Sequence, residues 1–291
     1  MIVDPNEVTV QEMQGYLQGA IVPRPIAFAS TQDSNGNVNL SPFSFFNVFS
    51  SNPPVVVFSP SRRARDNSTK HSLENVREVP EVVINIVNFS MVQQASLSST
   101  EYPKGVNEFV KAGLTPVSSA KVKPPRVNES PVSFECVVNE IIPLGEKGGA
   151  GNLVICEVVL AHIKDEILNA SKQIDPFKLD AVARMGANWY CRAQGEAIFE
   201  VPKPLQKLGI GIDSIPSSIR YSSVLTGNDL GMLGNVELLP TRQEVDEVSR
   251  RGDVKQANAI GIEANHRLAA TYLKSGNVND AWKVLLSFEQ K

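Results

Sequence analysis

The chain has 291 residues, of which 42% are hydrophobic and 20% charged, a composition typical of folded globular proteins rather than disordered ones. A chain of this length forms one large domain or two ordinary ones, and it buries a core without disulfides or structural metals. The formal charge of -3 gives no global basic field, so nucleic acid is not an expected partner.

The first part of the chain predicts three strands joined by tight connections. Residues 26–31 and 38–50 are rich in β-branched and aromatic side chains, and a third apolar run covers 55–59. Asn35 and Gly36 lie in the turn between the first two runs and are expected to supply the positive φ angles of a short hairpin. The first two strands are therefore expected to pair antiparallel, as the start of a barrel or sheet.

A polar segment, residues 60–79, follows the third strand and predicts a loop that leads into a helix. Ser68 or Thr69 is the expected N-cap, and Leu73 and Val76 fall near one face of the helix. The further elements expected in chain order are a strand, two short helices and two long strands, at residues 81–88, 89–99, 106–113, 132–142 and 152–167. Six strands with few helices between them disfavour a doubly wound nucleotide-binding fold and favour a mainly β barrel.

After about Pro202 the chain becomes mostly helical. Apolar residues recur at helical spacing around Leu268 and Tyr272, the pattern breaks at 275–280, and it resumes around Trp282. This predicts a terminal pair of helices, and one pair is too few for a solenoid array. We therefore expect two domains, residues 1–200 and a largely helical extension at 201–291 that packs on the first domain or on a dimer partner.

The cysteines and the N-terminus indicate a cytoplasmic protein. Cys136, Cys156 and Cys191 lie far apart and form no CxxC pair, which weighs against structural zinc and a disulfide framework. The N-terminus lacks a charged and then apolar leader, and no run approaches the 18 apolar residues of a membrane span. No metal site and no membrane partner are expected.

Residues 59–72 have the composition of a phosphate site. The segment lies where a strand gives way to a helix, and it contains cations and hydroxyl groups: Arg62, Arg63, Arg65, Lys70, Ser61, Ser68, Thr69 and Ser72. Hydroxyl donors, helix-start amides and fixed cations together stabilise a dianion. The alternative is an ordinary solvated run of charged residues.

Residues 24–59, RPIAFASTQDSNGNVNLSPFSFFNVFSSNPPVVVFS, resemble the flavin reductase-like family of FMN-binding split-barrel proteins. A comparable RPI, NLAPFSFF, PP and FS pattern recurs in that family. Later segments match in the same order: KHSLENVRE (70–78), NEFVKAGLTP (107–116), PPRVNESPVSFEC (124–136) and RMGANWY (184–190). The resemblance spans roughly residues 15–200 and implies a mainly β, six-stranded Greek-key split β-barrel with flanking helices and a C-terminal helical extension.

The resemblance also implies FMN, with its isoalloxazine along residues 44–47 and its phosphate near the next loop. The cofactor-binding residues carried over are Arg24, Ser44, Phe45, Phe46, Asn47, Ser59, Arg65, Lys70, Ser72 and Tyr190. His162 is expected on the nicotinamide side of the flavin, and Arg184 is expected to line the flavin or pair with a phosphate. The alternatives are barrel packing for the phenylalanines, a strand-end hydrogen bond for His162 and a surface ion pair for Arg184.

One departure from the family pattern concerns the phosphate loop. Relatives commonly carry a Lys-Asp-Thr triplet where this chain has Lys70, His71 and Ser72. Lys70 and Ser72 carry over as expected phosphate contacts, and no such contact is assigned to His71.

The activity implied by the resemblance is oxidoreduction. Hydride passes from NADH or NADPH through bound FMN to free flavin or another acceptor, in a homodimer, and the sequence leaves open whether a monooxygenase is a partner. The flavin itself accepts and donates the hydride, so no strong general acid or base is required of the protein. Two alternatives stay open: a non-catalytic FMN-binding or interaction protein, and a split-barrel oxidase of a small substrate.

Overall fold

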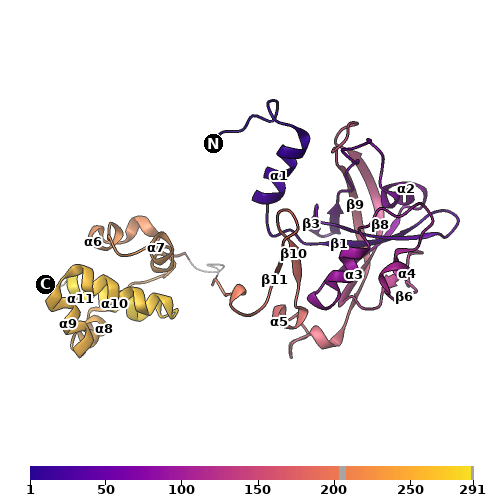
Figure 1. Cartoon of the computed structure of the whole chain (residues 1–291). Helices are drawn as coiled ribbons and strands as arrows, with labels where there is room; N and C mark the ends of the chain where they lie inside the picture. The colour runs from indigo at the N-terminus through magenta and orange to yellow at the C-terminus, as the bar shows by residue number, and fades with distance from the viewer. Residues whose placement is uncertain (203–207, 290–291) are drawn as a thin grey trace. The chain divides into compact units, whose positions relative to one another are not determined.

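The computed structural model describes residues 1–202 and 208–289, and its first unit, Met1–Phe199, is built on one antiparallel sheet (Figure 1). Seven strands form this sheet: β1 (Ala27–Gln32), β2 (Val38–Phe43), β3 (Phe46–Ser51), β4 (Pro54–Phe58), β5 (Glu81–Ile86), β8 (Val132–Pro143) and β9 (Asn152–Ile163). Their hydrogen-bonded order is β2-β1-β5-β8-β9-β4-β3, and all neighbours are antiparallel. The predicted fold class is confirmed.

The two edges of this sheet are joined by two residues. β2 ends at Phe43 at one edge of the sheet, whereas β3 begins at Phe46 at the other edge. Because consecutive Cα atoms are only about 3.8 Å apart, Ser44 and Phe45 connect these strands only if the sheet curls until its edges meet. The sheet is therefore a barrel split at Ser44, and the single strand expected over 38–50 is divided there, giving seven strands instead of six.

Short elements surround the barrel within the first unit. Its helices are α1 (Val10–Ala20), α2 (His71–Glu78), α3 (Val92–Leu97), α4 (Glu108–Ala112) and α5 (Pro176–Leu179). Two small hairpins pair β6 (Pro116–Val117) with β7 (Arg126–Val127), and β10 (Val182–Arg184) with β11 (Tyr190–Arg192). Single 3₁₀ turns cover Phe89–Met91, Asp165–Ile167 and Gly195–Ala197.

Both faces of β1 are buried, because the barrel interior and the flanking helices each supply apolar partners. Ala27 and Ala29 belong to the core of the barrel, which Leu73 and Val76 of α2 help to fill. Phe28 belongs to a second cluster that includes buried residues of α3 and α4. The predicted apolar face of α2 is thus confirmed.

Cys136 and Cys156 lie in the barrel core and are free thiols. Burial raises the pKa of Cys136 to about 12, so this side chain is an uncharged thiol at neutral pH. Both residues therefore act as small apolar core residues.

The hairpin between β1 and β2 differs in detail from the prediction. The two strands pair antiparallel as expected, but of the two turn residues only Gly36 has a positive φ, at 84°. The carboxylate of Asp33 accepts hydrogen bonds from the backbone N–H groups of Asn35 (3.0 Å) and Asn37 (2.8 Å). This Asx-type turn holds Asn35 without a left-handed conformation.

Two element boundaries also differ from the prediction. The N-cap of α2 is Lys70, because the hydroxyls of Ser68 and Thr69 donate instead to carboxylates, those of Asp66 and Glu74. The last long strand was expected to reach residue 167, but β9 ends at Ile163 and a 3₁₀ turn follows.

The second unit, Glu200–Lys291, is helical in its described part. A 3₁₀ turn at Ile212–Ser214 precedes α6 (Ser217–Arg220), α7 (Gly227–Gly234), α8 (Arg242–Ser249), α9 (Gly252–Ile260), α10 (Ile262–Lys274) and α11 (Val278–Glu289). The predicted terminal pair is α10 and α11, and Trp282 lies fully buried in the unit's core. No helix within residues 1–202 and 208–289 combines the length and apolar character needed to cross a membrane.

Candidate functional site

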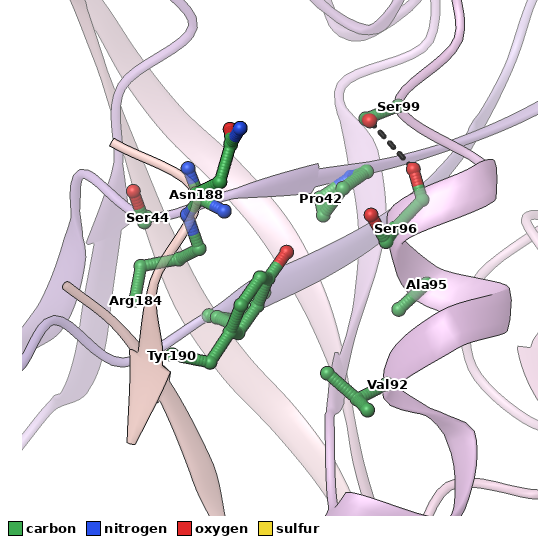
Figure 2. A pocket seen from close by; sticks show the side chains of 10 residues that line it. Pro42, Ser44, Val92, Ala95, Ser96, Ser99, Arg184, Asn188 and Tyr190 are labelled. Atoms are coloured by element: carbon green, nitrogen blue, oxygen red, sulfur yellow. Dashed lines mark hydrogen bonds between the residues drawn. The ribbon is translucent and has the colours of Figure 1, made fainter. Parts of the chain in front are cut away.

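A cavity of about 330 Å³ lies between helix α3 and the β10–β11 hairpin, beside the point where the barrel is split (Figure 2). Pro42 and Ser44 come from the end of β2, and the hairpin contributes Arg184, Asn188 and Tyr190. The remaining lining residues are Ile26, Val92, Ala95, Ser96 and Ser99. Sequence segments far apart in the chain therefore meet here, among them the predicted Ser44, Arg184 and Tyr190.

One wall of this cavity is a stacked pair. The guanidinium of Arg184 lies over the ring of Tyr190, 4.6 Å from its centroid, and Arg184 Nη2 donates to the carbonyl of Ala187 at 2.7 Å. Figure 2 shows the pair opposite the side chains of α3. A cation held on an aromatic face gives the cavity a flat wall with a fixed positive charge.

Two further cavities adjoin this one in turn, on the side away from the hairpin. A cavity of about 190 Å³ shares Pro42, Ser44 and Ser99 with the first. It adds residues of α1, of β2 and its link to β3, and of the strand-to-helix loop: Gln14, Gln18, Ser41, Phe43, Phe45, Ser59, Ser61 and Lys70. A third, of about 270 Å³, shares Ser61 and Lys70 with the second. We call these three adjoining cavities the groove; they extend from Tyr190 to the loop that contains Arg63 and Arg65.

The far end of the groove is strongly charged. Arg63, Arg65 and Lys70 line it, and the carboxylate of Glu101 lies among them. Burial lowers the pKa of Lys70, and the neighbouring Arg63 guanidinium lowers it further. An anion bound beside Lys70 would offset both effects, which is the electrostatic character expected of a phosphate site.

Several donors along the groove have no protein partner. In the described parts of the chain, the hydroxyls of Ser41, Ser59 and Ser61 make no hydrogen bond to a protein group, and the Lys70 ammonium has only a long contact of 3.8 Å to Glu101. Folded proteins usually pair such groups with protein, water or ligand. These four residues therefore form a set of donors suited to a phosphorylated, hydroxyl-bearing ligand.

Glycines of the β8–β9 turn hold the charged loop in place. A Cβ atom on Gly148 would lie 2.9 Å from the carbonyl oxygen of Ala64 and 3.0 Å from that of Arg63. A Cβ on Gly151 would lie 2.6 Å from Ser59 Oγ. The turn was predicted only as a reversal, and the close approach of its backbone to residues 59–64 is what the structure adds.

Gly148→Ala is expected to push the backbone of the charged loop away from the turn. Overpacking of this kind costs about 1–3 kcal/mol of folding stability, and the shifted Arg63 should also weaken the binding of phosphorylated flavin. Urea unfolding and flavin titration measure the two effects. Gly15→Ala is the matched control, because no atom lies within 4 Å of the added methyl group and alanine favours helix α1. Equal behaviour of the two variants would contradict the role given to Gly148.

Arg24 lies beside the groove as a buried cross-link rather than as a free cation. Its Nη1 donates to the carbonyls of Gln18 (2.5 Å) and Ile21 (2.7 Å) at the end of α1, and its Nη2 donates to the carbonyl of Met185 (3.0 Å). Its Nε donates to Ser44 Oγ at 3.4 Å. Arg24 thus ties together three segments that line the groove, and its role toward a cofactor stays a prediction.

Other predicted residues lie at the margin of the groove. Arg65 is largely exposed and pairs with Asp66 and Glu101 at the charged end. Ser72 is buried and accepts a hydrogen bond from Asn39 Nδ2 at 2.8 Å, in a small cavity next to Lys70. The charged loop therefore comes together as expected, but the Ser72 hydroxyl already has a protein partner.

Besides Arg24, three predicted residues lie outside the linings described above. Phe46 packs against the barrel core, and the exposed Asn47 accepts a hydrogen bond from the N–H of Val48. His162 Nε2 lies 2.6 Å from Glu135 Oε1, and this carboxylate also accepts backbone N–H groups of the loop 120–122. Their roles toward a cofactor stay predictions.

Sequence reasoning missed the contribution of helix α1. Gln14 and Gln18 line the groove, and no helix was expected at residues 10–20. Thr9 and Glu12 form a capping box in which each side chain pairs with the other residue's backbone N–H. The Thr-x-x-Glu spacing is a recognised sign of a helix start and was present in the sequence.

Comparisons with known proteins agree with this architecture. Residues 19–176 match the model of the flavin reductase like domain. An uncharacterized protein of Aquifex aeolicus is 36% identical over 200 residues, which cover 67% of this chain and 100% of that protein. Nitrilotriacetate monooxygenase component B from Bacillus cereus is 32% identical with a TM-score of 0.64, over 69% of this chain and 98% of that one. Flavoredoxin of Desulfovibrio vulgaris shares the fold at 20% identity, with a TM-score of 0.55 over 71% and 98% of the two chains. The chain belongs to the flavin reductase-like family of split-barrel proteins.

Proposed function

We propose that this chain binds FMN in the groove and transfers hydride from NADH or NADPH through it to free flavin or another acceptor. The observation that carries the proposal is the chemical difference between the two ends of the groove. One end has a flat aromatic wall with both apolar and hydroxyl-bearing neighbours, the middle has unpaired hydroxyls, and the other end has cations. FMN has the same division, because a planar ring system and a phosphate dianion are joined by a hydroxyl-bearing chain.

The residues at the aromatic end suit the ring system. Tyr190, Val92, Ala95 and Pro42 offer apolar surface, while Arg184 supplies positive charge. When bound there, FMN supplies the hydride-transfer chemistry. The protein's part is to hold the ring, shield it from water and stabilise negative charge on it.

The residues at the other end suit the phosphate and the chain that carries it. Ser41, Ser59 and Ser61 offer hydroxyls along the middle of the groove, and Lys70 offers a half-buried ammonium. Hydrogen bonds to charged groups of this kind are about twice as strong as neutral ones. FMN is therefore favoured over unphosphorylated riboflavin.

Replacing Lys70 by alanine is expected to weaken FMN binding by about 1–3 kcal/mol, or about 5- to 150-fold in Kd. Riboflavin, which lacks the phosphate, should bind the variant and the wild type equally. Titration monitored by flavin fluorescence measures both ligands.

Lys104→Ala provides the matched control for Lys70→Ala. Lys104 is an exposed lysine of the same region that pairs with Glu74 at 3.4 Å, so its loss should change FMN affinity little. Unchanged FMN affinity in Lys70→Ala, or an equal loss in both variants, would remove Lys70 from the phosphate site.

The proposal also includes a partner protein, an oligomeric state and a cellular location for this chain. The similarity to nitrilotriacetate monooxygenase component B supports a monooxygenase that receives reduced flavin from this chain. A homodimer and a cytoplasmic location follow from the family resemblance and from the scattered cysteines. Sedimentation at several protein concentrations tests the dimer, and a monomer at all of them would contradict it.

A further inference from the structure

Glu101 occupies the charged end of the groove, in the position where an anionic ligand would contact the cations. It lies in the turn after α3, more than 30 residues from the loop it contacts. Its Oε1 lies 3.0 Å from Arg63 Nε and 3.8 Å from Lys70 Nζ, and its Oε2 lies 3.0 Å from Arg65 Nη2. One carboxylate thus contacts three of the four cations that line this end; the fourth, Arg62, donates to Asn67 instead.

The Glu101 side chain is charged and can be displaced from the cations by another anion. Hydrogen bonds from Arg65 and Arg63 hold the pKa of Glu101 below its usual range, so the carboxylate is ionised at neutral pH. Its side chain is 43% exposed. Ion pairs with that exposure contribute little to stability, and a competing anion can replace them.

The other contacts of Arg63 do not depend on Glu101. Arg63 Nη1 donates to Ser68 Oγ at 3.0 Å and to the carbonyl of Thr69 at 2.5 Å. These bonds hold the guanidinium on its own loop, so its position survives the loss of the carboxylate. The backbone of Lys70 is fixed as the N-cap residue of α2, whereas the Lys70 ammonium has only its 3.8 Å contact with Glu101.

We propose that Glu101 is an internal competitor of the flavin phosphate and lowers the affinity of the groove for phosphorylated flavins. This inference rests on the proposed function. A phosphate can contact Arg63 and Lys70 fully only when the Glu101 carboxylate moves away from them. Riboflavin has no phosphate and leaves the carboxylate in place. Glu101 therefore favours exchange of FMN with solution over its permanent retention in the groove.

The test is to measure the Kd of FMN and of riboflavin for the full chain and for Glu101→Gln by flavin fluorescence. The variant keeps the shape of the side chain and removes its charge. The expected result is FMN binding that is tighter by about 3- to 10-fold, with the riboflavin Kd unchanged. The gain should shrink as salt is added, because the competing charges are partly exposed.

Glu146→Gln is the matched control. Glu146 lies in the β8–β9 turn beside the same loop, where its backbone carbonyl accepts from Asn67 Nδ2 at 3.0 Å, and its substitution should leave both Kd values unchanged. Equal or weaker FMN binding by Glu101→Gln would overturn the inference and make Glu101 a residue that orients the cations. Riboflavin binding that tightens as much as FMN binding would also overturn it. Wild-type protein that binds neither flavin would instead overturn the proposed function itself.

Discussion

Trp282→Ala is expected to destabilise the second unit by about 3–5 kcal/mol. The indole is fully buried in the core of α6–α11, and its Nε1 donates to the carbonyl of Leu233 at 3.1 Å. The substitution removes a large apolar volume and leaves a buried carbonyl without its donor. Domains are commonly only about 5–15 kcal/mol more stable than their unfolded chains, so the loss is a large fraction of the total.

Urea unfolding followed by circular dichroism measures this loss of stability. FMN titration shows whether the substitution also affects the first unit. If residues 200–291 fold as a separate domain, Trp282→Ala lowers the unfolding midpoint of the helical signal and leaves FMN affinity unchanged. Trp189, the other tryptophan, is 75% exposed, so Trp189→Ala should leave the midpoint where it is. Loss of FMN binding in parallel with the helical signal would contradict the division into two domains.

Arg24→Ala is expected to cost the first unit about 2–4 kcal/mol and to weaken FMN binding as well. Arg24 is 6% exposed, and loss of its guanidinium leaves the carbonyls of Gln18, Ile21 and Met185 without their donor. Because these carbonyls belong to segments that line the groove, the wall should loosen together with the fold.

Arg24→Lys separates charge from geometry. Lysine keeps the positive charge but lacks the planar fork that donates in three directions, so it should recover only a small part of the stability. Full recovery by lysine would show that charge alone matters at this position. Stability of Arg24→Ala equal to wild type would contradict the cross-linking role.

Local sequence patterns were sufficient to predict most elements of the barrel. The strand-forming residues of β1 and β2 and the turn at Gly36 specify a hairpin through contacts between near neighbours. The break at Ser44 was not predictable in this way, because residues 38–50 are continuous strand-forming sequence. What divides them is the closure of the barrel, which depends on pairing between distant strands.

The candidate site was predicted in part for the same reason. Lys70 and its neighbours cluster along the chain, and Arg184 and Tyr190 stand in a motif that resembles the family's. Glu101 reaches the charged loop from more than 30 residues away, and Ser72 is turned toward Asn39. Contacts of this kind depend on tertiary packing and leave no periodic signal in the sequence.

The central claim is that this chain passes hydride from a nicotinamide cofactor through FMN bound in the groove. Anaerobic stopped-flow mixing of the protein–FMN complex with NADH or with NADPH tests it most directly, with protein-free FMN as the control. The proposal predicts rapid loss of the oxidised-flavin absorbance with at least one nicotinamide and much slower loss without protein. Persistence of that absorbance with both nicotinamides, or its loss only on addition of a small amine or alcohol, would contradict the claim.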